Sequence, residues 1–140
     1  MNHMLDKNKS EPTVLRPKDW PQPKGYSDGM TAKGRLIVTG GCVGWDKSGK
    51  FAEGLAAQTK QTLENIVAII AEAGAEPRHI VRLTWYVTDI ENYLVLQREI
   101  GAAYREVIGK HFPAMAVVQV VRLVEPKALV EIETTAIVPD

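Results

Sequence analysis

Apolar and polar residues follow two distinct periods along this chain. Between Leu55 and Ala73 the apolar positions recur at steps of three and four, while glutamine, lysine and glutamate fill the other faces. This spacing predicts an amphipathic helix that stops at Gly74. A second stripe of the same kind predicts a helix from about Ile90 to Ile108, which Pro113 cannot continue.

Other segments carry the signals of strands. The run Ile80–Thr88 is dense in β-branched and aromatic residues, which favour strands. Two further strands are predicted near the end of the chain, separated by a turn-like Glu-Pro-Lys sequence, and a short hairpin is predicted before the first helix. The two strands are predicted over Ala114–Leu123 and Leu129–Val138. The hairpin is predicted over residues 29–32 and 35–39, with its turn at Lys33-Gly34.

The resulting order, β-β-α-β-α-β-β, predicts an α+β fold in which two helices cover one face of a mixed sheet. In the predicted strand Ala114–Leu123 both alternating faces are largely apolar, with Val118 and Val120 on one side and Val117 and Val121 on the other. A strand that is apolar on both faces is normally buried on both. We therefore expect the uncovered face of the sheet to pack against other copies of the chain in a homo-oligomer.

The length and composition narrow the class of protein. The chain of 140 residues matches the size of one domain, which we place at residues 20–140 after a flexible, lysine- and proline-rich tail at residues 1–19. Lysine plus arginine equals aspartate plus glutamate, 17 each, so no overall field draws the protein to nucleic acid or to an anionic membrane. Apolar runs stay well short of the roughly 20 residues that span a bilayer.

The cysteine and histidine residues indicate the redox compartment of the protein and whether a metal site is expected. The single cysteine, Cys42, cannot form an internal disulfide, which favours a reducing compartment. His3, His79 and His111 do not share ligand spacing with Cys42, so no metal site is predicted. We expect a soluble, cytoplasmic protein.

Several strings in the chain are similar, in order, to those of a known family. They are Lys24-Gly25-Tyr26-Ser27, Gln58-Thr59, Leu63-Glu64-Asn65-Ile66, Ala73-Gly74, the run from His79 to Asp89, Phe112-Pro113-Ala114-Met115 and Val130-Glu131-Ile132-Glu133. Together they resemble the RidA family, also called YjgF or L-PSP, from about Trp20 to Val138. The resemblance implies a chorismate-mutase-like subunit in a homotrimer, with small-molecule clefts at the subunit interfaces.

Active members of that family hydrolyse reactive enamines and imines, such as 2-aminoacrylate, to 2-oxo acids and ammonia without a cofactor. The resemblance implies that Tyr26 closes the pocket, that Glu131 holds a water or moves protons, and that Val117 offers its backbone. The position of the arginine that clamps the substrate carboxylate is occupied by Met115. Methionine has no charge and no donor, so a carboxylate there would lose about 1.5–3 kcal/mol of charged hydrogen bonding. We therefore expect a neutral or apolar ligand group at Met115.

Other positions also depart from the family pattern. Gly41 stands where the family has glutamine, Gly101 where it has asparagine, and Gly25 where it has proline. Several pocket positions have therefore changed together with Met115. The resemblance accordingly places the chain in a branch without the arginine.

Each candidate residue also has a purely structural interpretation. Met115 could fill an irregular gap in packing, and Tyr26 could cap a subunit interface. Glu131 and Glu133 share one face of a strand and could be surface carboxylates. Arg98 and Arg105 are read as a solvated face of the second helix.

Two classes of function therefore stay open. The first is a deaminase of the 2-iminobutanoate/2-iminopropanoate type with altered substrate preference. The second is a non-catalytic, metabolite-binding or chaperone-like trimer. Endoribonuclease activity is a third option, which the neutral charge does not favour.

Overall fold

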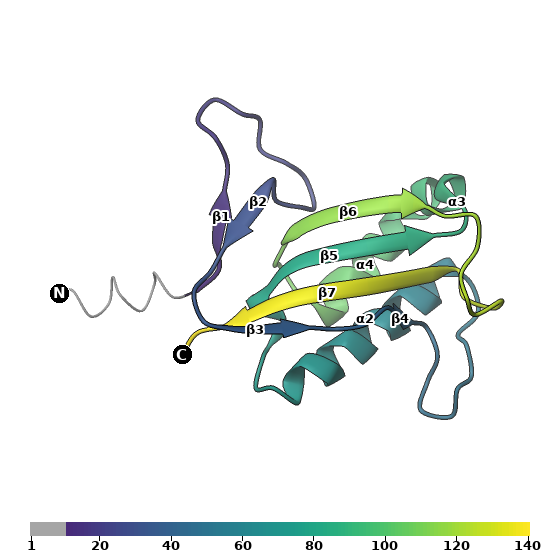
Figure 1. The fold of residues 1–140 in the computed structure, drawn as a ribbon. Helices are drawn as coiled ribbons and strands as arrows, with labels where there is room; N and C mark the ends of the chain where they lie inside the picture. Colours follow the sequence, from purple (N-terminus) through teal and green to yellow (C-terminus); the bar gives the residue numbers. More distant parts are fainter. Residues whose placement is uncertain (1–10) are drawn as a thin grey trace.

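The computed structural model describes residues 11–140 and contains two sheets (Figure 1). The main sheet has the order β3-β7-β5-β6, with β4 also paired to β7. Its strands are β3 (Arg35–Val38), β4 (Cys42–Val43), β5 (Ile80–Val87), β6 (Ala114–Gln119) and β7 (Val130–Val138). Strands β5 and β6 run parallel, and the other pairs are antiparallel. The smaller sheet pairs β1 (Thr13–Leu15) with β2 (Gly29–Thr31).

The helices lie together on one side of the main sheet (Figure 1). They are α2 (Leu55–Ala71), α3 (Ile90–Val95) and α4 (Gln97–Val107), with a 3-10 turn, η1 (Pro77–His79), leading into β5. No element within residues 11–140 covers the opposite face, which we call the open face. None of the helices in this range is both long and apolar enough to cross a membrane.

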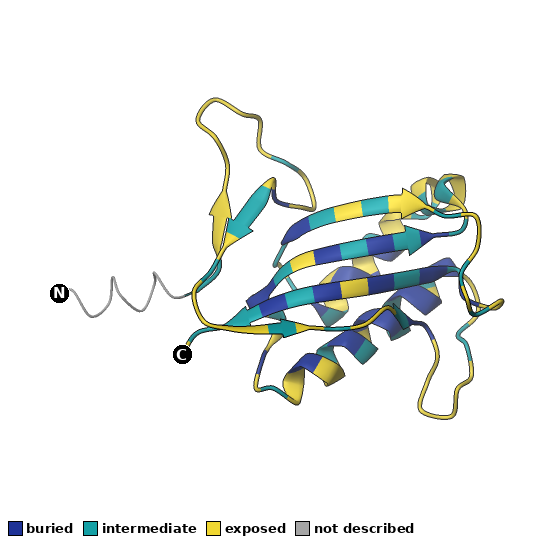
Figure 2. Cartoon of the chain, in the orientation of Figure 1, coloured by how far each residue is buried: buried dark blue, intermediate teal, exposed yellow. Residues whose placement is uncertain are grey.

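The core lies between the helices and the sheet, and strand alternation decides which residues enter it. In β5 the side chains of Leu83, Trp85 and Val87 are buried, whereas the intervening residues are not. Strand β7 alternates in the same way (Figure 2). Ile132 accordingly faces the helices and Glu131 faces outward. The predicted apolar stripe of α2 packs onto these strands, with Leu63, Ile66 and Ile70 fully buried.

Side-chain amides on α2 tie this helix to segments that are distant in sequence. The Gln58 amide donates to the Lys127 carbonyl at 2.9 Å and accepts from the Leu129 amide at 2.8 Å. The Asn65 amide donates to the carbonyls of Val43 and Trp45 at 3.0 and 2.9 Å. Gln58 is buried and therefore needs such partners, whereas Asn65 is half-buried. The family-like strings around both residues thus have a structural role here.

The structure confirms the predicted α+β class with helices over one face of a mixed sheet. The first helix and the strand beginning at Ile80 lie where the periodicity places them. The predicted hairpin is wrong, because β2 pairs with β1 while β3 pairs with β7. The glycine at its predicted turn, Gly34, lies directly against the Val138 carbonyl, so the chain passes along β7 there.

Two further predicted elements differ in their bounds. The second helix is interrupted at Leu96, whose φ of −96° and ψ of 16° leave the helical range and separate α3 from α4. The strand predicted over Ala114–Leu123 ends at Gln119, and Val121 beyond it is 99% exposed. The strand therefore offers two apolar faces only as far as Gln119.

The flexible tail predicted for residues 1–19 lies outside the described residues as far as residue 10. Within its remainder, Thr13–Leu15 form β1 and pair with β2, so regular structure begins earlier than the predicted boundary. The sequence did not indicate β1 because its partner is 16 residues further along the chain. One domain over residues 20–140 stays a prediction.

Candidate functional site

A cavity of about 420 Å³ lies on the helix side of the sheet. Strands β5 and β6 form its floor, α3 and α4 form a wall, and the loop Lys24–Tyr26 borders it. The lining residues are Lys24, Gly25, Tyr26, Trp85, Tyr93, Gln97, Ile100, Gly101, Tyr104, Arg105, Phe112, Met115 and Val117. This volume is within the range of small-molecule pockets in proteins.

The floor is apolar because of the register between the two parallel strands. Leu83 pairs with Met115 and Trp85 pairs with Val117, which places Met115 and Val117 on the helix side. Trp85 is only 2% exposed, and its indole N–H is buried without a hydrogen-bond partner among residues 11–140. Its ring meets Tyr93 edge-on at 6.2 Å between centroids, which favours one fixed arrangement of the two rings.

The wall contributes two tyrosines that remain neutral at physiological pH. Tyr104 stacks on Phe112 with centroids 5.8 Å apart and donates its hydroxyl proton to the His111 carbonyl. Burial raises the pKa of Tyr104 far above its usual value and also raises the pKa of Tyr93. Among the lining residues, formal charge is therefore carried by Lys24 and Arg105 alone, and both are cationic.

Contacts of Ser27 hold the Lys24–Tyr26 loop against the start of β6. The Ser27 amide donates to the Pro113 carbonyl at 3.0 Å, and the Ser27 hydroxyl donates to the Phe112 carbonyl. Gly25 has a φ of +79°, which a proline ring, held near −65°, cannot adopt. Tyr26 follows at the cavity mouth with 44% of its surface exposed.

Glu131 lies elsewhere, on the open face of β7. Its carboxylate sits directly against Gly41, so a side chain at position 41 would collide with the carboxylate in this conformation. Burial raises the pKa of the neighbouring Cys42 thiol, and the Glu131 charge adds to this increase. Two residues along, Glu133 accepts a hydrogen bond from the Tyr86 hydroxyl at 2.8 Å. Glu131 does not line the cavity of its own chain.

The structure thus brings three of the four predicted site residues together, namely Tyr26, Met115 and Val117, and separates Glu131 from them by the thickness of the sheet. It also adds residues that the sequence analysis did not select. Arg105 is exposed, as expected of a solvated helix face, and it also lines the cavity, four residues after Gly101. That spacing places Gly101 and Arg105 on one helix face. Because Gly101 departs from the family pattern, the sequence contained a signal that could have pointed to Arg105.

Metal ligands are not gathered in the described part of the chain. Within residues 11–140, no group of three or more His, Cys, Asp or Glu side chains is arranged to hold a metal ion.

The fold and the cavity define a class of small α+β protein, with a mixed sheet covered on one face and a pocket between its edge strand and a helix. Comparison with known families makes this specific, since residues 19–138 match the endoribonuclease L-PSP family. The chain belongs to this family, which includes the RidA and YjgF proteins.

Individual relatives agree with this assignment. A 2-iminobutanoate/2-iminopropanoate deaminase of Salmonella typhimurium is 36% identical over 109 residues, covering 74% of this chain and 80% of the relative. The crystal structure of the Rid-family protein YyfB from Yersinia pestis is 32% identical, with a TM-score of 0.77, covering 91% of this chain and 99% of that one. The crystal structure of the Escherichia coli YjgF gene product is 30% identical, with a TM-score of 0.66 and coverage of 89% and 98%.

Proposed function

We propose that this protein is a deaminase that hydrolyses a small imine or enamine in the cavity, with a substrate preference altered by Met115. The observation that carries the proposal is the convergence of Tyr26, Met115 and Val117 on one pocket. The resemblance to the family selects the same three residues from the sequence alone. The name of the Salmonella relative, 2-iminobutanoate/2-iminopropanoate deaminase, supplies the reaction type.

The reaction needs only water and a group that orients it. The water oxygen bonds to the imine carbon while the C=N π electrons take up a proton at nitrogen. The C–N bond then breaks, the carbonyl forms, and nitrogen leaves as ammonia. A carboxylate that accepts a proton from the water would assist the first step, and Glu131 is our candidate for this role.

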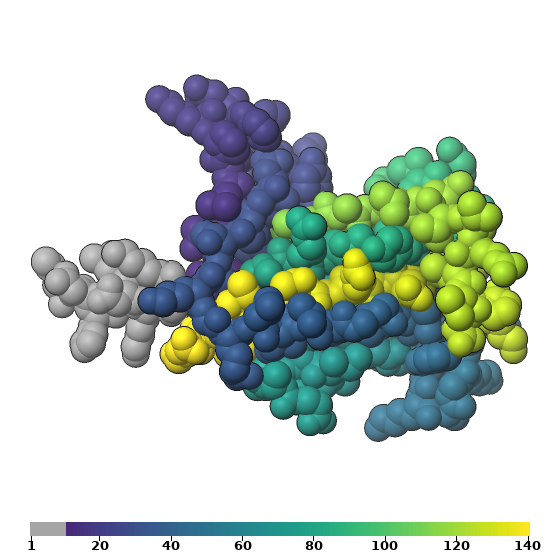
Figure 3. Space-filling view, in the orientation of Figure 1, coloured from purple at the N-terminus to yellow at the C-terminus, as the bar shows by residue number. Residues whose placement is uncertain are grey.

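Glu131 can serve this cavity only if a second copy of the chain supplies it, because within one chain the sheet lies between them. We therefore propose that the protein assembles as a homotrimer whose clefts lie at the subunit interfaces. The open face supports this arrangement. Figure 3 shows β3, β7 and β5 on this face without a further layer over them, and apolar side chains lie exposed on it. Leu36, Val38 and Val118 are 64%, 65% and 43% exposed. Exposed apolar residues spread over one sheet face favour burial against another subunit.

Turnover of freshly generated imines tests the proposal. The purified protein should accelerate release of the 2-oxo acid from 2-aminoacrylate, from 2-iminobutanoate, or from an analogue with a larger apolar side chain. The larger analogue should be preferred, because Met115 and Val117 offer apolar contacts.

Two carboxylate variants make the test specific. Glu131→Gln should lower the rate by about a hundredfold or more, the usual contribution of a positioned acid or base. Glu133→Gln, two residues along the same strand face, should retain the wild-type rate. Equal rates for wild type and Glu131→Gln, with the assembly intact, would remove Glu131 from the mechanism.

A non-catalytic binding role is the second candidate, favoured by the missing donor at Met115 and by the position of Glu131 outside the cavity. It predicts saturable ligand binding without release of 2-oxo acid from any of these imines. Activity in Met115→Arg alone would show a competent cleft whose natural ligand is of another kind. Endoribonuclease activity is not supported by the net charge of zero, and cleavage of a single-stranded RNA substrate would argue for it.

A further inference from the structure

We propose that Arg105, assisted by Lys24, is the anion-binding group of the cavity, and that the ligand is a carboxylate whose apolar substituent lies on Met115 and Val117. The inference rests on the cavity assigned under the proposed function, but it does not require turnover. It identifies the substrate class as an apolar carboxylate held by its charged end at the mouth.

Within one chain, the charged residues that line the cavity are all of one sign. Lys24 and Arg105 line it, and neither aspartate nor glutamate does. In a partly enclosed site, such an imbalance produces a positive potential that attracts anions. An anionic ligand is therefore favoured over a cationic one, although Met115 itself offers no charge.

Arg105 is available for a ligand. Its guanidinium makes no ion pair or hydrogen bond with any side chain or carbonyl of residues 11–140, unlike the guanidinium of Arg78, which pairs with Glu11 and Glu76. The adjacent acid, Glu106, is paired with Lys60 on α2 at 3.0 Å, on another side of α4. A bidentate pair with a carboxylate is the contact to which a planar guanidinium is best suited.

Gly101 makes space for this guanidinium. A Cβ built at position 101 would lie 3.4 Å from Arg105 Nη1, which is already van der Waals contact, so a longer side chain would compete with the guanidinium for this space. Glycine in a helix interior costs about 0.5–1 kcal/mol relative to alanine, so its presence on α4 calls for a compensating role. Gly101 and Arg105 therefore act together at the mouth of the cavity, because the missing side chain at 101 leaves space for the guanidinium.

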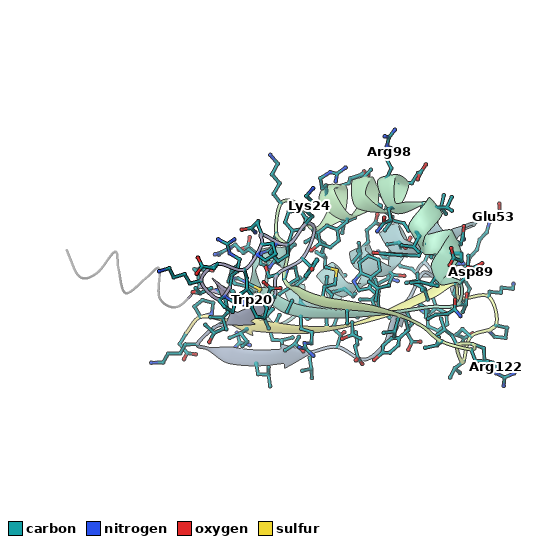
Figure 4. All side chains as sticks on the ribbon, turned by 90° about the horizontal axis from the view of Figure 1, so that it is seen from above. Trp20, Lys24, Glu53, Asp89, Arg98 and Arg122 are labelled. Atoms are coloured by element: carbon teal, nitrogen blue, oxygen red, sulfur yellow. The ribbon has the colours of Figure 1, made fainter. Side chains whose placement is uncertain are left out.

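The apolar and charged linings occupy different parts of the cavity. Met115, Val117 and Trp85 form the floor on the sheet, whereas Arg105 comes from α4 and Lys24 from the loop that borders the cavity. Figure 4 shows Lys24 on the helix side of the sheet, beside α4. A ligand that is charged at one end and apolar at the other matches this division, with its carboxylate at the mouth and its substituent on the floor.

Binding of an unreactive pair of probes tests the inference without turnover. Phenylacetate has a carboxylate and an apolar ring, and phenylacetamide has nearly the same shape without charge. Isothermal titration calorimetry would measure binding. Phenylacetate should bind about 10- to 100-fold more tightly than the amide, in keeping with a charge-assisted hydrogen bond.

The variants assign the preference to named residues. Arg105→Gln should abolish the difference between the two probes, Lys24→Gln should reduce it, and Gly101→Asn should weaken phenylacetate selectively. Arg98→Gln is the matched control, because Arg98 projects outward from the same helix and does not line the cavity (Figure 4). It should bind both probes as the wild type does. Unchanged unfolding midpoints would confirm that each variant is folded.

Three outcomes would overturn the inference: equal affinity for acid and amide, phenylacetate binding in Arg105→Gln equal to that of the wild type, or no binding of phenylacetate at millimolar concentration. The proposed deaminase function fails separately. If no imine is hydrolysed but carboxylate binding depends on Arg105, the anion site stands and the deaminase proposal falls. If imines are hydrolysed equally with and without Arg105, the reverse holds.

Discussion

Three glycines near the candidate site show how single residues shape it. Gly25 supplies a positive φ, Gly41 leaves room for the Glu131 carboxylate, and Gly101 leaves room for the Arg105 guanidinium. All three are positions where the chain departs from the family pattern. Each glycine therefore has its own geometric reason. Only at Gly25 is that reason the backbone conformation; at Gly41 and Gly101 it is space for a neighbouring side chain.

Replacement of Gly25 by alanine should destabilise the protein by about 1 kcal/mol, because a Cβ is sterically unfavourable at a φ of +79°, in the left-handed region. Urea unfolding would measure the loss in free energy. Gly40→Ala is a suitable control, since a Cβ at Gly40 also meets open space but its φ lies outside the positive range. Equal losses for the two variants would contradict the conformational explanation.

At the scale of elements, side-chain acceptors stabilise the starts of two helices, one through a long-range contact and one through a local contact. The Gln119 side chain at the end of β6 accepts from the Ile90 amide at 2.9 Å, at the start of α3. At the start of η1, the Glu76 amide donates to His79 Nδ1 at 2.9 Å. Both contacts satisfy amides at a helix start that have no partner within the helix.

The η1 contact predicts a dependence of stability on pH. Burial lowers the pKa of His79, and the charge of Arg78 contributes to this decrease. Protonation of Nδ1 would also remove the acceptor for the Glu76 amide. The unfolded chain, with a histidine pKa of about 6.5, then binds more protons than the folded protein as pH falls below that value. His79 therefore makes its full contribution to the free energy of unfolding above about pH 6.5. This contribution declines as the pH falls from there toward the lowered pKa of the folded state.

Urea unfolding between pH 5 and 8 would measure this effect. His79→Gln retains an acceptor for the Glu76 amide but does not titrate. The free energy of unfolding of the wild type should therefore fall more steeply on acidification than that of the variant. Parallel curves for the two proteins would show that His79 does not contribute to the pH dependence.

At the scale of the whole molecule, the open face of the sheet is the main unexplained surface. It presents exposed apolar residues beside Glu131 and Glu133, and it is continuous across β3, β7 and β5 (Figure 3). The proposed trimer accounts for both features, since it buries the apolar residues and brings Glu131 to a neighbouring cavity.

A charge introduced on this face should therefore prevent assembly. Val38→Glu is expected to shift the protein from three chains to one in size-exclusion chromatography with light scattering, because an unpaired carboxylate would be buried at the interface. Ile69→Glu, at a residue 45% exposed on α2, should leave the assembly unchanged. A wild type that is itself monomeric would refute the proposed trimer and, with it, the role of Glu131 in the cavity.

The extent to which the sequence predicts the structure differs between elements. The periodicity from Leu63 to Ile70 and the composition of Ile80–Thr88 identify their elements because burial on one face imposes a local pattern. The partner of β3 was mispredicted because the tight turn at Lys33-Gly34 suggested a neighbour in sequence. Its actual partner, β7, is about a hundred residues away, and the choice depends on hydrogen bonds that leave no local signal.

For the site, the sequence alone determined the family resemblance, the presence of Met115 at the clamp position and the selection of Tyr26 and Val117. Only the tertiary structure decided which of these residues meet. The register of β5 and β6 turns Met115 and Val117 toward the helices, while alternation along β7 turns Glu131 away. Packing of α4 then brings Arg105 to the same cavity. Strand register and helix placement arise from contacts across the whole core, and so no single segment encodes them.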